Sequence, residues 1–419
     1  MKVAFQTLGC KVNQYETNAL AEKLRNSGHE IVSADGFADI YVVNTCTVTS
    51  MADRKSRQQI RRAKKLNPDG FVVVTGCYSE LNPEEALNMT GADLVIENRN
   101  KLNLPEYIKG LPVKAAGSAQ GVTEIEQRTR AFIKIQDGCD RYCSYCIVPY
   151  ARKELQSTPK SDIITEGENL IKSGYKEIVL TGINTALYKP ADGAGLEEVV
   201  GGLDGLPGDF RIRLSSLEPT VIDADYVKRL LKYDRLCRHI HLSLQSGSDK
   251  ILKLMNRRYD TRDYMKIVKV LLEFDAGYGI STDIITGFPG ETEEDFKESL
   301  KLVERVDFCK VHVFKFSARK GTAAAGMKEH VTGNEKKSRS ELLIKAGESS
   351  ARRFFESNIG RKERVLVEEY LEKQGVYTGY AGNYIKVYID KKYSDSISLN
   401  AFTEVKLTGL YEDGMKGEP

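Results

Sequence analysis

Short apolar runs that alternate with polar, helix-like stretches fill the first 120 residues and most constrain the fold. The runs KVAFQTLGC, DIYVVNTC and GFVVVTGC are rich in β-branched and aromatic residues, and the sequence between them is helical in composition. This alternation is typical of βαβ units and predicts a parallel sheet covered by helices. Each run ends at or just before a cysteine: Cys10, Cys46 or Cys77. Because consecutive parallel strands end at the same edge of a sheet, we expect these three thiols to converge.

A second series of strand-like segments begins at residue 131. Six β/α units predict a partial (β/α)6 barrel, with active groups at the carboxyl ends of the strands. The six segments are AFIKIQDG, EIVLTGIN, RIRLSSLEP, HIHLSLQSG, GISTDIITGFPGE and KVHVFKFSAR.

Residues 333–358 predict a charge-rich helix, and the sequence after it alternates like short strands. The strand-like remainder is large enough only for a small β-barrel or sandwich. A chain of 419 residues has room for two to four domains of ordinary size. We therefore predict an α/β protein with three domains, at 1–115, 125–357 and 358–416, and a linker over 112–130.

Composition excludes several classes of protein. The formal net charge of +3 is too small to indicate a nucleic-acid partner by itself, so any basic surface must be local. No segment approaches the roughly 18 apolar residues of a membrane span, so we expect a cytoplasmic protein without membrane contact. Eight cysteines are few for a disulfide scaffold of this length, and a reducing compartment would keep them as thiols.

Cys139, Cys143 and Cys146 form a Cys-x-x-x-Cys-x-x-Cys motif just after the first strand of the second series. A structural zinc site needs four protein ligands, and the nearby sequence supplies only three. Three thiolates suit a [4Fe–4S] cluster with one iron left open, which can bind the amino and carboxylate groups of S-adenosylmethionine. A zinc knuckle with a distant fourth ligand is the alternative, and it fits the strand-end position less well.

This motif resembles the signature of radical S-adenosylmethionine enzymes, and CSYCIVPYAR resembles their methylthiotransferase branch. Within that branch, Gly9 to Thr17 (GCKVNQYET) resembles the enzymes that act on threonylcarbamoyladenosine in tRNA. Further blocks that resemble the family are NTCTVT, VVTGCY, RLSSLEP, HLSLQSGSDKILKLMNRRY, TDIITGFPGET and FKFSARKGT.

The resemblance implies two [4Fe–4S] clusters and S-adenosylmethionine as cofactors. Cys139, Cys143 and Cys146 would hold the barrel cluster, and the three cysteines of the first domain would hold an auxiliary cluster used in sulfur insertion. Three buried structural cysteines are the alternative for the second set, since free cysteine is often buried. Cys237 and Cys309 match no motif and are expected in the core. The implied cofactor contacts are Tyr145, Gly182, Glu218, Ser243, Gln245, Gly287 and Gly290.

Two regions are candidates for RNA contact. A basic helix is predicted near residues 53–65, with four cations on one face, although such a face is as often only solvated. The carboxyl-terminal domain resembles the TRAM domain, a small RNA-binding β-barrel, with a dimerisation or lid module as the alternative. The candidate residues are Arg54, Arg57, Arg61 and Lys65 on the helix and Arg364, Tyr384, Lys386 and Tyr388 in the barrel.

The resemblance implies a tRNA methylthiotransferase that converts N6-threonylcarbamoyladenosine beside the anticodon (position 37) to its 2-methylthio derivative. An inert aromatic C–H bond defeats side-chain acid–base catalysis, so a cofactor radical is required. Expected partners are tRNA, an electron donor of the flavodoxin or ferredoxin type and a sulfur source. The alternatives are isopentenyladenosine or a ribosomal-protein aspartate as substrate, or an iron–sulfur RNA-binding protein without turnover.

Two positions depart from the family pattern. Lys153 follows Arg152 where the family usually has glycine, which raises a question about the backbone path there. Tyr188 lacks the glycine that commonly follows it, so its placement is also open. A cobalamin enzyme is disfavoured, because the first domain contains only His29 and no Asp-x-His-x-x-Gly motif.

Overall fold

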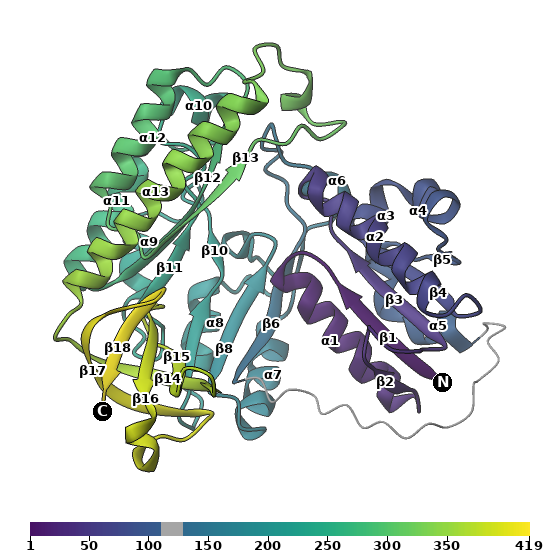
Figure 1. Ribbon diagram of the computed structural model, residues 1–419, viewed down its shortest axis with the longest axis horizontal. Coiled ribbons are helices and arrows are strands. Elements are labelled where there is room, and N and C mark those ends of the chain that lie inside the picture. The colour runs from purple at the N-terminus through teal and green to yellow at the C-terminus, as the bar shows by residue number, and fades with distance from the viewer. Residues whose placement is uncertain (110–128) are drawn as a thin grey trace. The chain divides into compact units, whose positions relative to one another are not determined.

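A computed structural model describes residues 1–109 and 129–419 (Figure 1). The predicted linker over 112–130 lies almost entirely outside the described residues. The described chain forms two compact units. The first holds residues 1–109 with Asp137–Leu155 and Ser317–Ala325, and the second holds 129–136 with Gln156–Phe316 and Gly326–Pro419.

The first unit contains a five-stranded sheet in the order β2-β1-β3-β4-β5, in which all neighbouring pairs are parallel. The central strands β3 and β4 are almost wholly buried, because helices cover both faces of a parallel sheet. The strands are β1 (Lys2–Thr7), β2 (Glu30–Val32), β3 (Ile40–Thr45), β4 (Phe71–Gly76) and β5 (Leu94–Val95). The helices are α1 (Lys11–Asn26), α2 (Ser50–Leu66), α3 (Cys77–Leu81), α4 (Pro83–Thr90), η1 (Asn98–Asn103), α5 (Leu104–Lys109) and α6 (Val148–Ala151).

The second unit contains two four-stranded sheets in the orders β7-β6-β8-β9 and β10-β11-β12-β13. The six predicted segments form β6, β8, β9, β11, β12 and β13, so the predicted partial barrel of β/α units is confirmed. The strands are β6 (Arg130–Asp137), β7 (Gln156–Ser157), β8 (Glu177–Gly182), β9 (Arg211–Leu214), β10 (Ser216–Leu217), β11 (His239–Leu242), β12 (Gly279–Thr286) and β13 (Lys310–Lys315).

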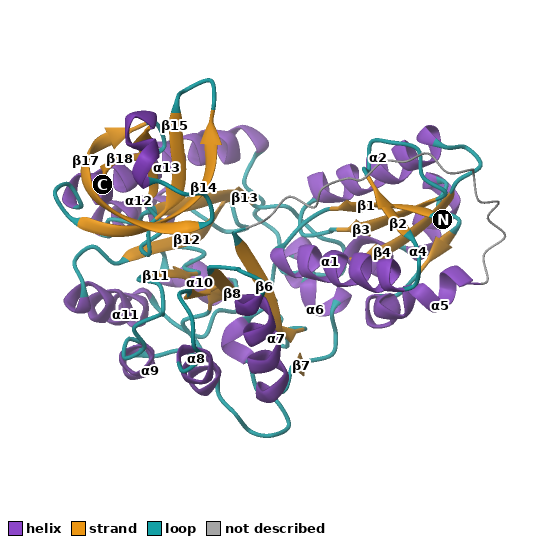
Figure 2. Cartoon of the chain, turned by 90° about the horizontal axis from the view of Figure 1, so that it is seen from below, coloured by secondary structure: helices purple, strands orange, loops and turns teal. Residues whose placement is uncertain are grey.

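Helices follow most strands of this barrel, and Figure 2 shows α8, α9 and α11 along one side of the sheets. One large apolar core joins strands and helices, because alternate strand residues such as Ile178, Leu180 and Ile240 are buried against the helices. The helices are α7 (Lys160–Lys172), η2 (Thr185–Leu187), α8 (Leu196–Asp204), α9 (Ala224–Leu230), α10 (Asp249–Leu254), α11 (Thr261–Phe274), α12 (Glu293–Arg305), η3 (Ala323–Gly326) and α13 (Gly333–Ser357).

The carboxyl-terminal residues of the second unit form a closed barrel in the order β14-β15-β16-β18-β17, which confirms the predicted small β-barrel. The run VYTGYAGNYIKVYI forms two antiparallel strands, because the backbone turns between Ala381 and Ile385. The elements are β14 (Lys362–Leu371), β15 (Val376–Tyr380), β16 (Lys386–Asp390), η4 (Lys391–Ser396), β17 (Ala401–Tyr411) and β18 (Gly414–Glu418).

Buried ion pairs attach this small barrel to the amino-terminal ends of the β/α strands. Glu177, fully buried at the start of β8, accepts hydrogen bonds from Arg211 (2.6 Å) and Arg213 (2.8 Å). The same guanidinium groups donate to the carbonyl oxygens of Tyr380 (3.0 Å) and Ala381 (3.3 Å) in the small barrel. Burial raises the pKa of Glu177, but the two arginines lower it by more, so the net shift is downward. The two barrels therefore share a charged, hydrogen-bonded interface.

Within the described ranges, none of the helices is both long and apolar enough to span a bilayer.

Candidate metal centres and cofactor site

Cys10, Cys46 and Cys77 meet at the carboxyl edge of the sheet in the first unit, as predicted. Strand pairing sets Thr45 opposite Gly76, so the cysteines that follow these residues are neighbours. The loop after β1 brings the backbone of Gly9 close to Cys46, where a Cβ on Gly9 would lie 2.9 Å from the sulfur. The convergence follows directly from parallel pairing of β1, β3 and β4.

Two of these cysteines follow glycines that the backbone requires. Gly9 and Gly76 have φ values of +104° and +100°, a region that residues with side chains rarely adopt. A Cβ on Gly76 would lie 2.4 Å from the backbone nitrogen of Thr45. Glycine therefore allows the chain to turn sharply at the strand end and to present the next residue at the shared edge.

The donor chemistry of this edge fits an iron–sulfur cluster. Burial, together with the neighbouring Cys77 and Cys10, raises the pKa of the Cys46 thiol to about 11. Protonated thiols are thus favoured without a cation, and binding of iron would release their protons. Three convergent cysteines without a fourth nearby protein thiolate suit a cubane better than a closed tetrahedral zinc site.

Arg152 lies at the centre of a buried charged network beside these cysteines. Its Nε donates to the sulfur of Cys77 at 3.4 Å, and its Nη2 donates to Asn13 at 2.8 Å and to Glu16 at 3.0 Å. Its Nη1 donates to both carboxylate oxygens of Asp137, at 2.7 and 2.8 Å. Burial lowers the pKa of Arg152, but these acidic partners raise it well above the usual arginine value. The guanidinium is therefore charged and ties α1 to the chain that carries the second cysteine motif.

Lys101 completes the network. Its Nζ lies 2.5 Å from Glu16, and both side chains are almost fully buried. Sequence analysis did not identify Glu16, Lys101 or Arg152 as site residues. An arginine at the end of the segment IVPYAR, which follows the second cysteine motif, was the available indication. Its partners on α1 and η1 are too distant in sequence to be paired by pattern.

The loop with Cys139, Cys143 and Cys146 follows β6 directly in the chain. Cys143 is buried, and the backbone N–H of Cys146 donates to its carbonyl at 2.9 Å. Gly138 opens the loop with φ +77°, where a Cβ would lie 2.0 Å from the carbonyl oxygen of Glu154. The compact turn brings three cysteines together, which fits the cluster-binding interpretation.

The two departures from the family pattern are both accommodated. Lys153 does not have the positive φ that would demand glycine. Tyr188 is buried, and its hydroxyl donates to the carbonyl of Thr158 at 2.8 Å. Cys237 and Cys309 are buried as expected, and burial raises the pKa of Cys309 to about 12.

The expected cofactor contacts of the second unit lie at or just after the carboxyl ends of its strands. Glu218, after β10, is buried and accepts hydrogen bonds from Asn184 (2.6 Å), Thr220 (2.9 Å) and Arg257 (2.9 Å). Ser243 is buried just after β11. A carboxylate with this many donors is held rigidly, and it can orient a polar ligand at the strand edge.

Gln245, Gly287 and Gly290 all have positive φ values, of +69°, +70° and +81°. The N–H of Gly287 donates to Glu291 at 2.7 Å, which orders the loop after β12. Gly182 ends β8, and a Cβ there would lie 3.0 Å from Gln136, so the two strands approach closely. Turns with positive φ values are typical of edges where the main chain contacts a ligand. Tyr145 lies within the cysteine loop of the first unit and is partly exposed.

The predicted basic helix is α2. Its outer face carries Arg54, Arg61 and Lys65, which are exposed, while Arg57 pairs with Glu85 at 3.4 Å. In the small barrel, Arg364 lies 3.8 Å from the centre of the Phe402 ring, and Lys386 pairs with Asp413 at 3.3 Å. Contact of these groups with RNA remains a proposal.

Tyr384 lies elsewhere than the RNA hypothesis requires. Its ring stacks on His239 with centroids 4.5 Å apart, and the guanidinium of Arg213 lies 4.8 Å from its centroid. A φ of +72° turns the residue toward the β/α barrel. The half-buried ring therefore packs between the two barrels, and base stacking by Tyr384 stays a prediction. Tyr388 is buried, and its hydroxyl bonds to Asp413.

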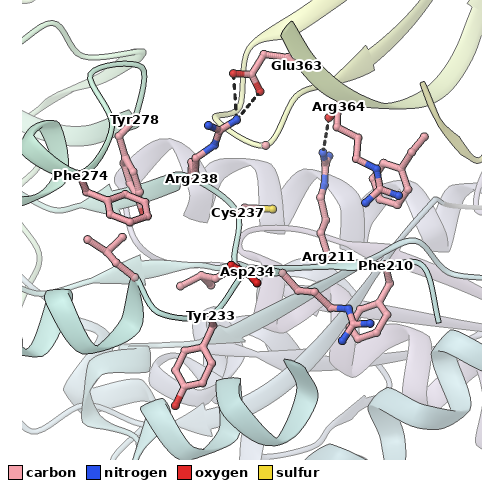
Figure 3. Close-up of a pocket in the computed structure, with 15 residues that line it drawn as sticks. Phe210, Arg211, Tyr233, Asp234, Cys237, Arg238, Phe274, Tyr278, Glu363 and Arg364 are labelled. Atoms are coloured by element: carbon pink, nitrogen blue, oxygen red, sulfur yellow. Dashed lines mark hydrogen bonds and ion pairs between the residues drawn. The ribbon is translucent and has the colours of Figure 1, made fainter. Parts of the chain in front are cut away.

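A cavity of about 420 Å³ lies at the same interface (Figure 3). Arg238 donates to Glu363 at 3.0 Å across it, and Arg211 donates to the carbonyl of Arg364 at 3.4 Å. The cavity opens beside the amino-terminal ends of β9 and β11, away from the strand ends that carry Glu218 and the expected cofactor contacts. It therefore belongs to the domain interface rather than to the candidate site.

The comparisons with known proteins agree with this geometry. The Radical SAM superfamily matches residues 133–303, and "Uncharacterized protein family UPF0004" matches residues 2–97. The solved radical S-adenosylmethionine methyltransferase TsrM from Kitasatospora setae aligns with a TM-score of 0.58 at 15% identity, over 77% of each chain. The open β/α barrel and the three-cysteine loop after its first strand define a radical S-adenosylmethionine protein.

Two curated relatives narrow the class. A threonylcarbamoyladenosine tRNA methylthiotransferase, MtaB, from Thermotoga maritima is 37% identical over 99% of this chain and 96% of its own. A tRNA-2-methylthio-N(6)-dimethylallyladenosine synthase from Endomicrobium trichonymphae is 33% identical over 99% of this chain and 100% of its own. The chain belongs to the methylthiotransferase family of radical S-adenosylmethionine proteins.

Proposed function

We propose that this protein converts N6-threonylcarbamoyladenosine at position 37 of tRNA to its 2-methylthio derivative. The observation that carries the proposal is 37% identity to a threonylcarbamoyladenosine enzyme over nearly the full length of both chains. The convergent cysteines of the first unit and the cysteine loop after β6 support it, because the reaction needs both radical generation and sulfur insertion. We expect the reaction to take place in the cytoplasm, because the substrate is tRNA.

Two cysteine triads would hold the metal cofactors. Cys139, Cys143 and Cys146 would bind one [4Fe–4S] cluster, and the triad of Cys10, Cys46 and Cys77 would bind a second. When bound, the clusters and S-adenosylmethionine supply the electron, the radical, the methyl group and the sulfur that the inert C–H bond requires. An electron donor of the flavodoxin or ferredoxin type and a sulfur source would complete the cycle.

The side chains of this protein bind and orient rather than transfer protons. Arg152 places a fixed positive charge and an N–H donor at Cys77, which would balance the negative charge of a thiolate-bound cluster. Glu218, held by Asn184, Thr220 and Arg257, offers a rigid acceptor at the strand edge for the polar groups of the cofactor. Such rigidity favours one cofactor orientation and excludes water from the reacting groups.

Nucleoside mass analysis tests the substrate assignment. Bulk tRNA from cells that lack the gene should lose 2-methylthio-N6-threonylcarbamoyladenosine and accumulate its unmodified precursor, and the intact gene should restore it. Loss of the methylthio-isopentenyl nucleoside instead would assign the protein to the second substrate class, which the 33% identical relative represents. Unchanged tRNA together with an altered ribosomal protein would overturn the tRNA proposal.

Iron content tests the cofactor assignment. Two four-iron clusters predict about eight iron atoms per chain after anaerobic reconstitution, and about four when Cys139, Cys143 and Cys146 are all replaced by alanine. Cys237→Ala is the matched control, since this buried thiol belongs to neither triad, and it should retain about eight. About four iron atoms in the unaltered protein would contradict the second cluster.

The two triads should also differ in function. Replacing Cys10, Cys46 and Cys77 by alanine should preserve reductive cleavage of S-adenosylmethionine but abolish methylthiolation. The reason is that radical generation depends only on the cluster in the loop after β6. Loss of 5′-deoxyadenosine formation in this variant, with that cluster intact by spectroscopy, would contradict the proposed roles.

A further inference from the structure

Three neighbouring strands of the β/α barrel carry a line of polar side chains on one face. His241 on β11 pairs with Ser281 on β12, and Asp283 on β12 pairs with His312 on β13. The alternate residues of these strands, such as Ile240 and Ile284, point the other way into the apolar core beneath the helices. The two histidines and the aspartate therefore share the face opposite the helices, which is the interior of the barrel.

The geometry brings three ligand atoms together. One ligand atom each from His241, Asp283 and His312 lies within 4.8 Å of the other two. Nε2 of His241 lies 3.2 Å from a carboxylate oxygen of Asp283. That nitrogen is buried and makes no hydrogen bond to any described residue, so the approach to Asp283 lacks hydrogen-bond alignment. A buried nitrogen without a hydrogen bond is a place where an ion or water is expected.

A hydrogen bond at the other ring nitrogen orients His241 as a metal ligand. Its Nδ1 lies 3.0 Å from the hydroxyl of Ser281, and the same hydroxyl lies 3.0 Å from Nε2 of His239. The Ser281 hydroxyl can accept a hydrogen bond from His241 Nδ1–H and donate its own proton to His239 Nε2. The lone pair of His241 Nε2 then faces Asp283 and His312, as in metal sites where an outer partner sets the imidazole tautomer.

We propose that His241, Asp283 and His312 form a binding site for a divalent transition-metal ion in the barrel interior, separate from both cysteine triads. Two imidazoles and one carboxylate suit borderline ions such as Zn²⁺, Fe²⁺ or Ni²⁺ and can also bind the harder Mn²⁺, and one carboxylate offsets half of the ion's charge. Three protein ligands leave coordination positions open, which would take water or an oxygen atom of the substrate. His312 is exposed, so its side chain can adjust to normal metal–nitrogen distances.

The position of the site gives it access to the expected cofactor region. Ser243 follows His241 by two residues, and alternation along an extended chain puts both on the same side. The site thus lies below the strand edge that carries Ser243 and Gln245, on the surface that a substrate entering the barrel would meet. The inference does not depend on which nucleoside the enzyme modifies.

Mn²⁺ binding followed by electron paramagnetic resonance tests the proposal. Mn²⁺ prefers nitrogen and oxygen ligands to thiolates, so it should not bind to the cysteines. In the reconstituted protein the cysteines are also already occupied by the iron–sulfur clusters. Tag-free, fully reconstituted protein should bind one Mn²⁺ per chain. Asp283→Asn and His312→Gln should each weaken binding at least tenfold. His330→Gln, which changes an exposed histidine of the same unit, is the matched control and should bind as the unaltered protein does.

Pulsed resonance of the bound ion identifies the ligands without reference to activity. Coupling to two imidazole nitrogens should be present in the unaltered protein and reduced to one in His312→Gln. Because His312 is exposed, this variant should fold normally, and its circular dichroism should match the control. The proposal would be overturned by absence of Mn²⁺ binding at millimolar concentration. Equal binding by Asp283→Asn and His312→Gln, or absence of imidazole coupling, would overturn it as well.

Discussion

Replacing Arg152 tests whether the buried network stabilises the sheet edge that carries the first cysteine triad. Arg152→Met keeps a long, flexible side chain but removes the positive charge and the six hydrogen bonds to Glu16, Asp137, Asn13 and Cys77. Glu16 is 1% exposed, so water cannot replace the lost partner. Lys101 remains bound to it at 2.5 Å and limits the loss.

The expected cost follows from the burial of the pair. Removing one partner of a buried ion pair usually costs about 3–5 kcal/mol, because the other charge is left without compensation. Asp137 is partly exposed and can be solvated, which favours the lower end of this range. A loss of about 3 kcal/mol corresponds to a roughly hundredfold larger population of the locally open state.

Hydrogen exchange measured by mass spectrometry is the suitable assay, because a chain of two compact units has no single global unfolding free energy. Amides of α1 and β3 should exchange roughly a hundredfold faster in Arg152→Met, under conditions where exchange reports the opening equilibrium. Arg152→Lys should be intermediate, because it keeps the charge but loses the planar fork of donors.

Arg99→Met is the matched control. Arg99 is 64% exposed at the side chain and pairs with the exposed Glu97, so its replacement should leave exchange in α1 and β3 unchanged. Exchange in Arg152→Met within threefold of the unaltered protein would refute the reasoning, because the network would then be dispensable for stability.

Three further predictions concern other parts of the chain. Tyr384→Ala should destabilise the second unit by about 1–3 kcal/mol in thermal unfolding, because the ring packs against the β/α barrel. Loss of tRNA affinity without loss of stability would contradict this packing role. If α2 contacts a phosphate, Lys65→Gln should reduce the slope of log affinity for tRNA against log salt concentration by about one unit in anisotropy titrations. If the small barrel contacts a phosphate, Lys386→Gln should have the same effect. An unchanged slope excludes the contact tested. Burial raises the pKa of Asp295, but hydrogen bonds, the largest from Lys250, lower it to about 2. The pKa in the folded protein therefore lies below the unfolded value, and the ionised carboxylate stabilises the fold by about 2 kcal/mol. This stabilisation should vanish as the pH falls from about 4 to 2. Asp295→Asn should already have lost this stability at neutral pH and should lose little more as the pH falls from about 4 to 2. An equal loss of stability in acid by the variant and the unaltered protein would contradict the role given to Asp295.

Much of the fold was predictable because its determinants are local. The alternation of β-branched runs with polar helical stretches predicted both parallel-sheet regions, since strand and helix periods appear within ten to twenty residues. The convergence of Cys10, Cys46 and Cys77 was also predictable, because parallel strands end at one edge whatever the details of packing. The Cys139 to Cys146 motif needs no tertiary information at all, since its three cysteines lie in one loop.

The placement of Tyr384 shows what such reasoning does not reveal. The resemblance to the TRAM domain implied that aromatic and cationic groups on adjacent strands, Tyr384 among them, contact RNA. Its actual contacts, His239 and Arg213, lie more than one hundred residues away and belong to the neighbouring barrel. Only the positive φ of the turn and the docking of the two barrels bring the ring to them.

The sequence by itself therefore determined which runs are strands, where each strand ends, and which cysteines follow the strands. The tertiary structure decided which charges meet. Glu16 lies 136 residues from Arg152 and 85 from Lys101 along the chain, and only packing of α1 and η1 against the chain after β6 unites them. His241, Asp283 and His312 share a face because β11, β12 and β13 pair in one register. Shifting the pairing of one strand by one residue would turn its side chains to the opposite face of the sheet. The register is set by burial of the whole apolar side of the sheet rather than by any local pattern.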